Sequence, residues 1–196
     1  MGGVTRYTYD NNDNVVSVTD ALGNVTAYTY DGRNRLTAVT YADGSRTELA
    51  YDSGNHVARV TTPGGRSLSY TYDSRNRCVS ITDDSGNVVE QTAYDHMGRT
   101  ISVADALGNL QHTTYNTEGE AISTTITSGE EEQTTHYEYD AFGRIIRTTD
   151  HGNHPVGITY DTLGNISSIT DANGGATTYR YDSYSRLISD TNAIGS

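Results

Sequence analysis

The same four residues, Tyr-Thr-Tyr-Asp, open and close the stretch from Tyr7 to Asp31, and variants of this phrase recur along the whole sequence. Aligned on the second tyrosine, successive copies lie 21 residues apart, except for one interval of 22 and one of 24. Self-similarity at a fixed period indicates a repeat architecture, in which each unit contacts its neighbours. The sequence therefore predicts one array of about nine repeats over residues 1–196. The repeat tyrosines are Tyr9, Tyr30, Tyr51, Tyr72, Tyr94, Tyr115, Tyr139, Tyr160 and Tyr181.

Two further positions recur in phase with the tyrosine, which we number zero. Position +1 is aspartate in eight repeats and Asn116 in the sixth. Position +14 is glycine in eight repeats and Asn153 in the seventh, so all variation in length falls after this position. We take the tyrosine, aspartate and glycine positions as the structural positions of the repeat. The aspartates are Asp10, Asp31, Asp52, Asp73, Asp95, Asp140, Asp161 and Asp182, and the glycines are Gly23, Gly44, Gly65, Gly86, Gly108, Gly129, Gly174 and Gly195.

Alternation within the repeat predicts two strands. Positions +7 and +9 are mostly Val or Ile, as in Val16 and Val18, while serine is common at +8, as in Ser17. This period of two is typical of a strand with one apolar face. Tyrosines at −2 and 0 form the returning strand, and the apolar residues at +6 are assigned to a thinner row on the opposite face. Abundant Thr, Val, Tyr, Gly and Asn exclude a helical reading.

Two turns separate the strands of each repeat. The first turn follows the tyrosine, and its Asp carboxylate can accept backbone N–H bonds while Asn34, Asn76, Gly143 or Gly164 takes a positive φ. The second turn, as in "DALGN", uses the same chemistry. The predicted fold class is all-β: tandem β-hairpin repeats forming one long, twisted, curved antiparallel ribbon of roughly 18 strands.

Charge and composition exclude several classes of protein. All 13 basic residues are Arg, and with 25 acidic residues the net charge is −12, so nucleic acid would be repelled. No apolar run approaches the roughly 20 residues that span a bilayer, and no signal peptide is apparent, so we expect a soluble chain without membrane insertion. The single Cys78 excludes an internal disulfide and is interpreted as a small buried apolar residue, which leaves the compartment open.

Candidate metal and ligand sites are weak. The segment Asp10–Asn14 lacks the Gly and Glu of a calcium loop, and His151 with His154 has no third ligand, so we expect no metal or other cofactor. Arginines at +5 are expected to screen the turn aspartates across adjacent hairpins. The segment "SGEEEQ", residues 128–133, is interpreted as an extended solvated turn. The arginines at position +5 are Arg35, Arg77, Arg99, Arg144 and Arg186.

No catalytic motif accompanies the repeats. The sequence has no G-x-S-x-G elbow, phosphate-binding loop or HExxH motif, and without Lys it cannot form a Schiff base. The acids recur in equivalent turns, whereas paired catalytic carboxylates need unequal environments. We therefore expect no enzyme activity and no catalytic residues.

The segments "YDGRNRLTAVTYADGS", "YDAFGRIIRTTD" and "YDSYSRLISDTNAIG" resemble the tyrosine-aspartate (YD) repeats of the Rhs family along essentially the whole chain. The resemblance implies a β-ribbon that winds into a hollow shell, which in bacterial toxin systems encloses a C-terminal toxic domain; a related shell occurs in Tc toxins and in teneurins, where it serves adhesion. Neither a metal-spike domain, nor the DPxG-type core motif, nor a toxic domain is recognised in this chain. We therefore expect a segment of such a shell.

Three functions follow as hypotheses: a structural container wall, a glycan-binding or adhesive surface built on the tyrosine rows, and an enzyme. The first is favoured, because hairpin formation and stacking explain every recurrent residue. Expected partners are further YD repeats or other shell segments and, in a full-length protein, a toxin cargo. Unpaired strand edges also predict homo-oligomers, although Asp190 stands at an otherwise apolar position. The resemblance suggests bacterial secreted or cell-surface delivery.

Overall fold

The computed structural model describes residues 3–192, and every regular element in this range is a β-strand. The 18 strands are antiparallel and belong to two compact units, Met1–Thr92 and Ala93–Ser196. The prediction of an all-β protein built from antiparallel hairpins is therefore confirmed. Gly195, which the sequence places at the last repeat glycine, lies outside the described residues.

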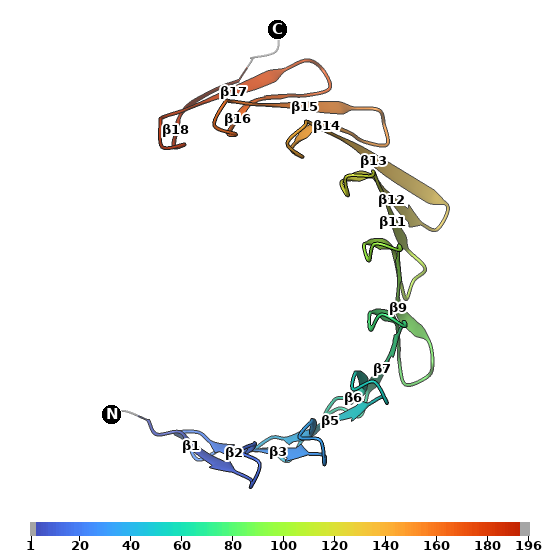
Figure 1. Cartoon of the computed structure of the whole chain (residues 1–196), viewed down its shortest axis with the longest axis vertical. Helices are drawn as coiled ribbons and strands as arrows, with labels where there is room; N and C mark the ends of the chain where they lie inside the picture. Colours follow the sequence, from blue (N-terminus) through green and yellow to red (C-terminus); the bar gives the residue numbers. More distant parts are fainter. Residues whose placement is uncertain (1–2, 193–196) are drawn as a thin grey trace. The chain divides into compact units, whose positions relative to one another are not determined.

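In the first unit each strand pairs with its neighbours in the chain, so that consecutive hairpins follow one another (Figure 1). The strands within a hairpin and those that link two hairpins both run antiparallel, as the pairing of Tyr7 with Val18 and of Val18 with Thr26 shows. The strands are β1 (Arg6–Tyr9), β2 (Val15–Thr19), β3 (Val25–Tyr30), β4 (Leu36–Thr40), β5 (Arg46–Tyr51), β6 (Val57–Thr61), β7 (Ser67–Tyr72), β8 (Cys78–Thr82) and the start of β9 (Val88–Tyr94).

The second unit repeats the same order of hairpins, coloured from green to red in Figure 1. Its strands are β10 (Thr100–Asp105), β11 (Leu110–Tyr115), β12 (Ala121–Ser128), β13 (Glu131–Tyr139), β14 (Ile145–Thr149), β15 (Pro155–Tyr160), β16 (Ile166–Thr170), β17 (Ala176–Tyr181) and β18 (Leu187–Asn192). Pro155 begins a strand, a position that suits a residue without a backbone N–H.

Both kinds of turn share one backbone geometry, except for the second turn at Gly129. In the first turn of the second repeat, Asp31 N–H donates to Arg35 C=O at 2.9 Å, and Asn34 N–H donates to Asp31 C=O at 3.0 Å. Asn34 has a φ of 58°, and the equivalent residue of every other such turn is also in the left-handed region. This is a three-residue hairpin loop closed by a left-handed residue, which explains why Gly and Asn recur there. The positive φ predicted for Asn34, Asn76, Gly143 and Gly164 is confirmed.

Eight of the repeat hairpins contain a β-bulge at position +7. In the second repeat Thr29 pairs with Ala38 but Tyr30 pairs with Leu36, which leaves Thr37 as the extra residue. The same shift recurs in the other repeats whose register is described. Residues directly opposite share a face, so position +6 lies on the tyrosine face. The sequence-based assignment of +6 to the opposite face was wrong, because simple alternation does not anticipate an extra residue.

The two longer repeats absorb their additional residues in the strands. In the 24-residue repeat Ser128 pairs with Glu131, so Gly129 and Glu130 alone form the turn. Gly129 has a φ of 60°, as the first central residue of a type II′ turn requires. The interpretation of "SGEEEQ" as an extended turn was therefore wrong, since its last residues belong to β13. In the 22-residue repeat a register shift in β9 accommodates the one extra residue.

The hairpins have very little deep core. Among the described residues, Ala38 and Ser67 are the buried ones, and most apolar strand residues are half-buried. Cys78 is also half-buried, so its interpretation as a buried residue was only partly right. Because apolar burial is shallow, contacts between neighbouring hairpins must contribute most of the stability. No helix within residues 3–192 could cross a membrane.

Candidate functional site: the joint between repeats

The most regular contact between repeats joins six of the repeat tyrosines to the repeat that precedes each of them. The Tyr51 hydroxyl donates a hydrogen bond of 2.8 Å to the backbone C=O of Leu36, fifteen residues earlier at position +6. We call this contact, together with the +5 side chain beside it, the repeat joint. The same hydroxyl bond is made by Tyr30 to Val15, Tyr72 to Val57, Tyr115 to Thr100, Tyr139 to Ala121 and Tyr160 to Ile145.

The joint occupies a place where the backbone ladder stops. Between the first two repeats, β2 and β3 pair over only three residues, ending with Ser17 opposite Ala27. Beyond this pair the strands no longer pair, and Tyr30 Oη reaches the C=O of Val15 at 3.0 Å. The tyrosine hydroxyl thus takes the place of the hydrogen bond that a neighbouring strand would donate to this carbonyl. Without the hydroxyl, the carbonyl would lose its hydrogen bond to water on folding and gain none in return. This explains why the position is Tyr in all nine repeats and never Phe.

A cation covers the tyrosine ring at several joints. The Arg35 guanidinium carbon lies 4.3 Å from the ring centre of Tyr51, and Arg144 lies 4.3 Å from that of Tyr160. Arg99 stacks on Tyr115 in the same way at 4.5 Å. Such stacking is worth about 0.5–1 kcal/mol at exposed sites. The ring is therefore held between the +5 side chain and the +6 carbonyl of the preceding repeat.

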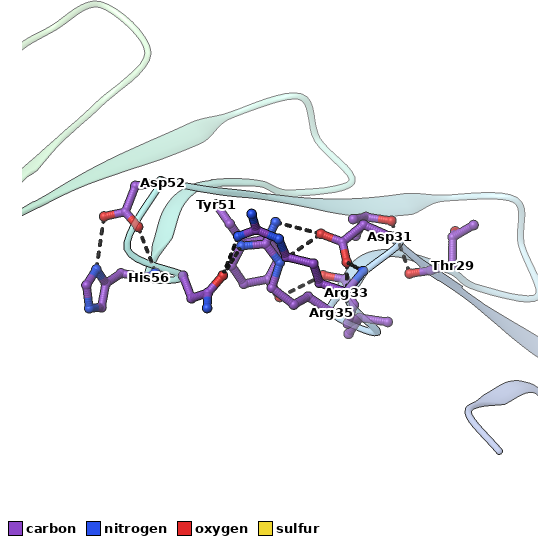
Figure 2. Close-up of polar contacts among 10 residues, drawn as sticks. Thr29, Asp31, Arg33, Arg35, Tyr51, Asp52 and His56 are labelled. Carbon is purple, nitrogen blue, oxygen red and sulfur yellow. Dashed lines mark hydrogen bonds and ion pairs between the residues drawn. The ribbon is translucent and has the colours of Figure 1, made fainter. Parts of the chain in front are cut away.

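The +5 arginine is itself held by the turn aspartate of its own hairpin (Figure 2). Asp31 Oδ1 accepts the backbone N–H groups of Arg33 and Arg35 at 2.8 and 3.1 Å, while Oδ2 accepts Arg35 Nε at 2.7 Å. These hydrogen bonds, that from the Arg35 side chain first, lower the pKa of Asp31 to about 2. The carboxylate thus caps the turn and fixes the guanidinium over the next tyrosine.

Other residue pairs replace the Asp–Arg pair in some repeats. His56 takes the +5 position in the third repeat, with Nδ1 3.0 Å from Asp52 and its ring centre 4.7 Å from that of Tyr72. In the sixth repeat the polarity is exchanged, because Asn116 Nδ2 donates to Glu120 at 2.7 Å. The constant requirement at these turns is a hydrogen-bonded pair between positions +1 and +5.

Two tyrosines at these joints have perturbed acidity. The pKa of Tyr72 and that of Tyr139 are raised above the ordinary value, first because burial disfavours the phenolate. Nearby anionic groups act in the same direction. Both hydroxyls must stay protonated to donate to the carbonyls of Val57 and Ala121.

The role expected for the +5 arginines needs a correction. Arg35, Arg77, Arg99, Arg144 and Arg186 each form an ion pair with the aspartate of their own turn, four residues earlier. Sequence reasoning had placed this screening between adjacent hairpins, because it treated the turns as parallel rows of charge. Between hairpins these arginines make other contacts. The Arg35 guanidinium stacks on the ring of Tyr51 and also donates to Asn55 Oδ1 at 2.8 Å. Two features of the sequence could have indicated this contact. Position +5 is often Arg or His, and the repeat position zero is always Tyr and never Phe.

The remaining candidate positions lie apart from any composite site. Asp10 caps its own turn through the N–H groups of Asn12 and Asn14. His154 pairs with Asp150 at 3.1 Å within the second turn of its repeat. Within the part of the chain that the structure describes, no three His, Cys, Asp or Glu residues gather as metal ligands. The repeat glycines such as Gly23 and Gly44 close second turns with a positive φ.

Two family models match the sequence. One, described as RHS Repeat, matches residues 1–24 and 9–46, and the other, described as Teneurin YD-shell, matches residues 66–192. No curated protein matches the chain.

Solved structures of Tc toxin proteins have a similar fold. The chain superposes on a mutant Tc holotoxin pore of Photorhabdus luminescens with a TM-score of 0.62 at 16% identity, covering 96% of this chain and 13% of that one. For a crystal structure of TcdB2-TccC3-Cdc42 the TM-score is 0.55 at 15% identity, with 97% and 14% covered. A TcdB2-TccC3 structure without its hypervariable C-terminal region gives a TM-score of 0.54 at 15% identity, again with 97% and 14% covered. The chain thus spans about a seventh of the length of these structures, and with the Teneurin YD-shell model matching most of its residues it belongs to the YD-shell family of RHS-type repeats.

Proposed function

We propose that this chain is a structural segment of a YD shell that, in a full-length protein, surrounds a toxin domain during delivery outside the producing cell. In this proposal the segment performs no catalysis. Its neighbours are further YD repeats, and its cargo is the toxin domain. The single observation that supports it best is the recurrence of the repeat joint, because the same contact can add hairpins without limit.

The chemistry of the joints supports a wall more than a catalytic or metal site. Five of the first turns repeat one arrangement of Asp and Arg, whereas active sites depend on groups with unequal environments. The hollows along the hairpins are open and shallow, for example the one of about 560 Å³ beside Phe142 and Tyr160. Binding sites for small molecules usually bury most of their ligand.

The geometry counts against the alternative of a glycan-binding surface. Sugar stacking needs an exposed aromatic face, but Arg35 covers the ring of Tyr51 and Arg144 covers that of Tyr160. The hydroxyls of both tyrosines are already used by backbone carbonyls. Tyrosine rows at the joints are thus explained by packing between hairpins.

The test joins two copies of the chain in the phase of the repeat. A fusion of residues 1–181 to residues 10–196 places Asp10 directly after Tyr181 and so restores a first turn. If the chain is a segment of a shell wall, the fusion extends one continuous array. The urea midpoint of the fusion should then be higher than that of the single chain, because an interface between repeats has been added. An out-of-phase fusion, residues 1–181 to residues 20–196, misplaces the tyrosines and should show no such rise.

Equal urea midpoints for the two fusions would contradict a wall in which the repeat joints must lie in phase. Turnover of ester, peptide or phosphodiester substrates by the purified chain, abolished by one substitution, would contradict the absence of catalysis. Saturable binding to a glycan panel would favour the adhesive alternative. Enclosure of cargo is tested in any longer protein that contains this chain: a C-terminal domain cleaved there by protease as fast as in isolation would contradict a shielding wall.

A further inference from the structure

The hairpin of β12 and β13 extends beyond its neighbours at the end where the two strands meet in a turn. β13 contains nine residues, whereas other returning strands of the second unit, such as β11 and β15, contain six (Figure 1). On one side, the residues from Glu131 to Thr135 pair with β12. On the other side, pairing with β14 begins only at His136, which lies opposite Thr149. This first stretch of β13 therefore has a strand neighbour on one side alone.

The open side of this stretch presents backbone groups that could pair with a further strand. Ser128 and Glu131 flank the two-residue turn and bond to each other, and from there the direction of the backbone groups alternates along the strand. The N–H and C=O groups of Glu132 and Thr134 therefore point away from β12. β14 does not reach them, because Asp150, which follows it, forms its backbone bonds within its own turn. An open strand edge of this kind is a template for another strand.

An open hollow lies along this edge. Its volume is about 560 Å³, and it is lined by Glu130, Glu131, Glu132, Gln133 and, from the neighbouring turn, His151. The three glutamates are exposed. Because successive side chains of a strand point to opposite faces, Glu131 and Glu132 place a carboxylate on each face of the edge. The edge thus combines available backbone groups, open space and negative charge.

We propose that the open edge of β13 binds an extended basic segment of another polypeptide, which adds to the sheet as one more antiparallel strand. The backbone of the segment bonds to the N–H and C=O groups of Glu132 and Thr134, the mode in which peptides extend a sheet. Arginine or lysine side chains, one on each face, lie against Glu131 and Glu132. Pairing of two β13 edges from two copies is disfavoured, because it brings like charges together. The site adds a partner to the proposed wall and does not depend on the wall function.

The test measures binding of the fluorescein-labelled peptide Val-Thr-Val-Arg-Arg to the full chain by fluorescence anisotropy at low salt. Antiparallel pairing places the two arginines of the peptide opposite Glu132 and Glu131, and its threonine opposite Thr134. This peptide should bind saturably, whereas Val-Thr-Val-Glu-Glu should not. N-methylation of the peptide threonine, whose N–H points toward β13, should raise the dissociation constant about tenfold. N-methylation of the second valine, whose N–H points away, should change it less than about twofold.

Variants of the chain separate the charge from the backbone groups. Glu131→Gln combined with Glu132→Gln should raise the dissociation constant about tenfold. Asp84→Asn combined with Glu118→Gln removes the same charge from exposed positions elsewhere and should change it less than about twofold. Thr134→Pro removes the outward N–H and leaves the ladder to β12 intact, so binding should weaken about tenfold. Thr134→Val keeps the N–H and should bind as the native chain does.

Amide hydrogen exchange locates the contact without any substitution. Exchange at Glu132 and Thr134 should be fast in the free chain and slow with the peptide bound, while Gln133, whose N–H faces β12, should be slow in both. Absence of saturable binding at about 1 mM peptide would overturn the proposal and show that the glutamates only keep other strands off the edge. Equal effects of the two charge-removing pairs, or no slowing at Glu132 and Thr134, would overturn it as well. None of these variants touches a repeat joint, so the fusion test of the wall function is judged separately.

Discussion

At the scale of single residues, the repeat tyrosine explains most of the design. Its ring fills the face shared by two hairpins, its hydroxyl satisfies a carbonyl that the ladder leaves behind, and its outer face meets a cation. The hydroxyl makes one of these contacts, and the aromatic ring makes the other two. They can therefore be separated by substitution.

Substitutions at Tyr72 should separate ring from hydroxyl. Tyr72→Phe removes only the bond of 2.9 Å to Val57 and should lower the free energy of unfolding by about 1 kcal/mol. Tyr72→Ala also removes the half-buried ring and should cost about 3 kcal/mol, at the low end for aromatic truncation. Urea unfolding of both variants provides the measurement. Thr71→Ala, on the exposed face, is the control and should change stability by less than about 0.5 kcal/mol; a cost for it equal to that of Tyr72→Ala would refute the assignment of faces.

Acid should destabilise the hairpins through the turn aspartates. Hydrogen bonds from Arg35 lower the pKa of Asp31 from 3.8 to about 2, and the pKa of Asp73 and that of Asp140 are lowered likewise by their arginines. A folded-state pKa below the unfolded value means that the stabilisation is complete above pH 4 or so and is lost as pH falls toward about 2.

Comparison with Asp31→Asn isolates this effect. The variant should unfold at lower urea than the native chain at pH 6, and the difference should shrink as both are titrated toward pH 2. A difference that stays constant over this range would show that the ionised carboxylate contributes nothing beyond its shape.

At the scale of elements, the turns determine where strands end. Every turn with this backbone geometry places one residue in the left-handed region, whether it follows the tyrosine or precedes the next strand. The requirement is local, so Gly or Asn at this position was sufficient to predict it at most turns, whereas Ser185 gives no such signal. The β-bulge was not predictable in the same way, because two adjacent apolar residues at +6 and +7 are equally compatible with a strand that has apolar residues on both faces.

Adjacent glycines in one second turn offer a matched pair. Gly65 has a φ of 79° and Gly64 does not lie in the left-handed region, while a Cβ at either position would meet nothing within 4 Å. Gly65→Ala should therefore destabilise by about 1–2 kcal/mol through backbone strain alone. Gly64→Ala should stabilise by about 0.4–1 kcal/mol by restricting the unfolded chain. Thermal or urea melts that rank the two variants in the reverse order would contradict the turn geometry.

At the scale of the whole molecule, the all-β fold and the antiparallel order of hairpins could be predicted from sequence, because they follow from the alternation and periodicity of the residues. The repeat joint could be predicted only in part. Tyrosines between hairpins were expected, but the carbonyl that accepts the hydroxyl bond depends on where backbone pairing between two strands ends. No residue type indicates that position. The same limit explains the error at residues 128–133, where Gly129 allowed a shorter turn and the acidic residues joined a strand.

Deleting a whole repeat should be tolerated far better than deleting half of one. Removal of residues 31–51 joins Tyr30 to Asp52 and restores a first turn with its tyrosine in phase. Circular dichroism should still show a β protein that unfolds cooperatively, with a smaller dependence on urea because less surface is exposed. Removal of residues 31–40 reverses the direction of every later strand, and that chain should be unstable or insoluble. Similar stability of the two deletions would argue against phased hairpins.

The antiparallel order of strands within each unit has a mechanical consequence. When a unit is pulled by its two ends, the strands are peeled apart one ladder at a time, because the described pairings within a unit join consecutive strands. The load therefore meets one joint after another and never all of them together. Stretching a single molecule should give a series of small, similar force peaks, each releasing a repeat of 21 residues, or about 70 Å of contour at roughly 3.4 Å per residue. Such a chain yields gradually under tension, and after each rupture the hairpins that remain are still folded and able to bind the released one again.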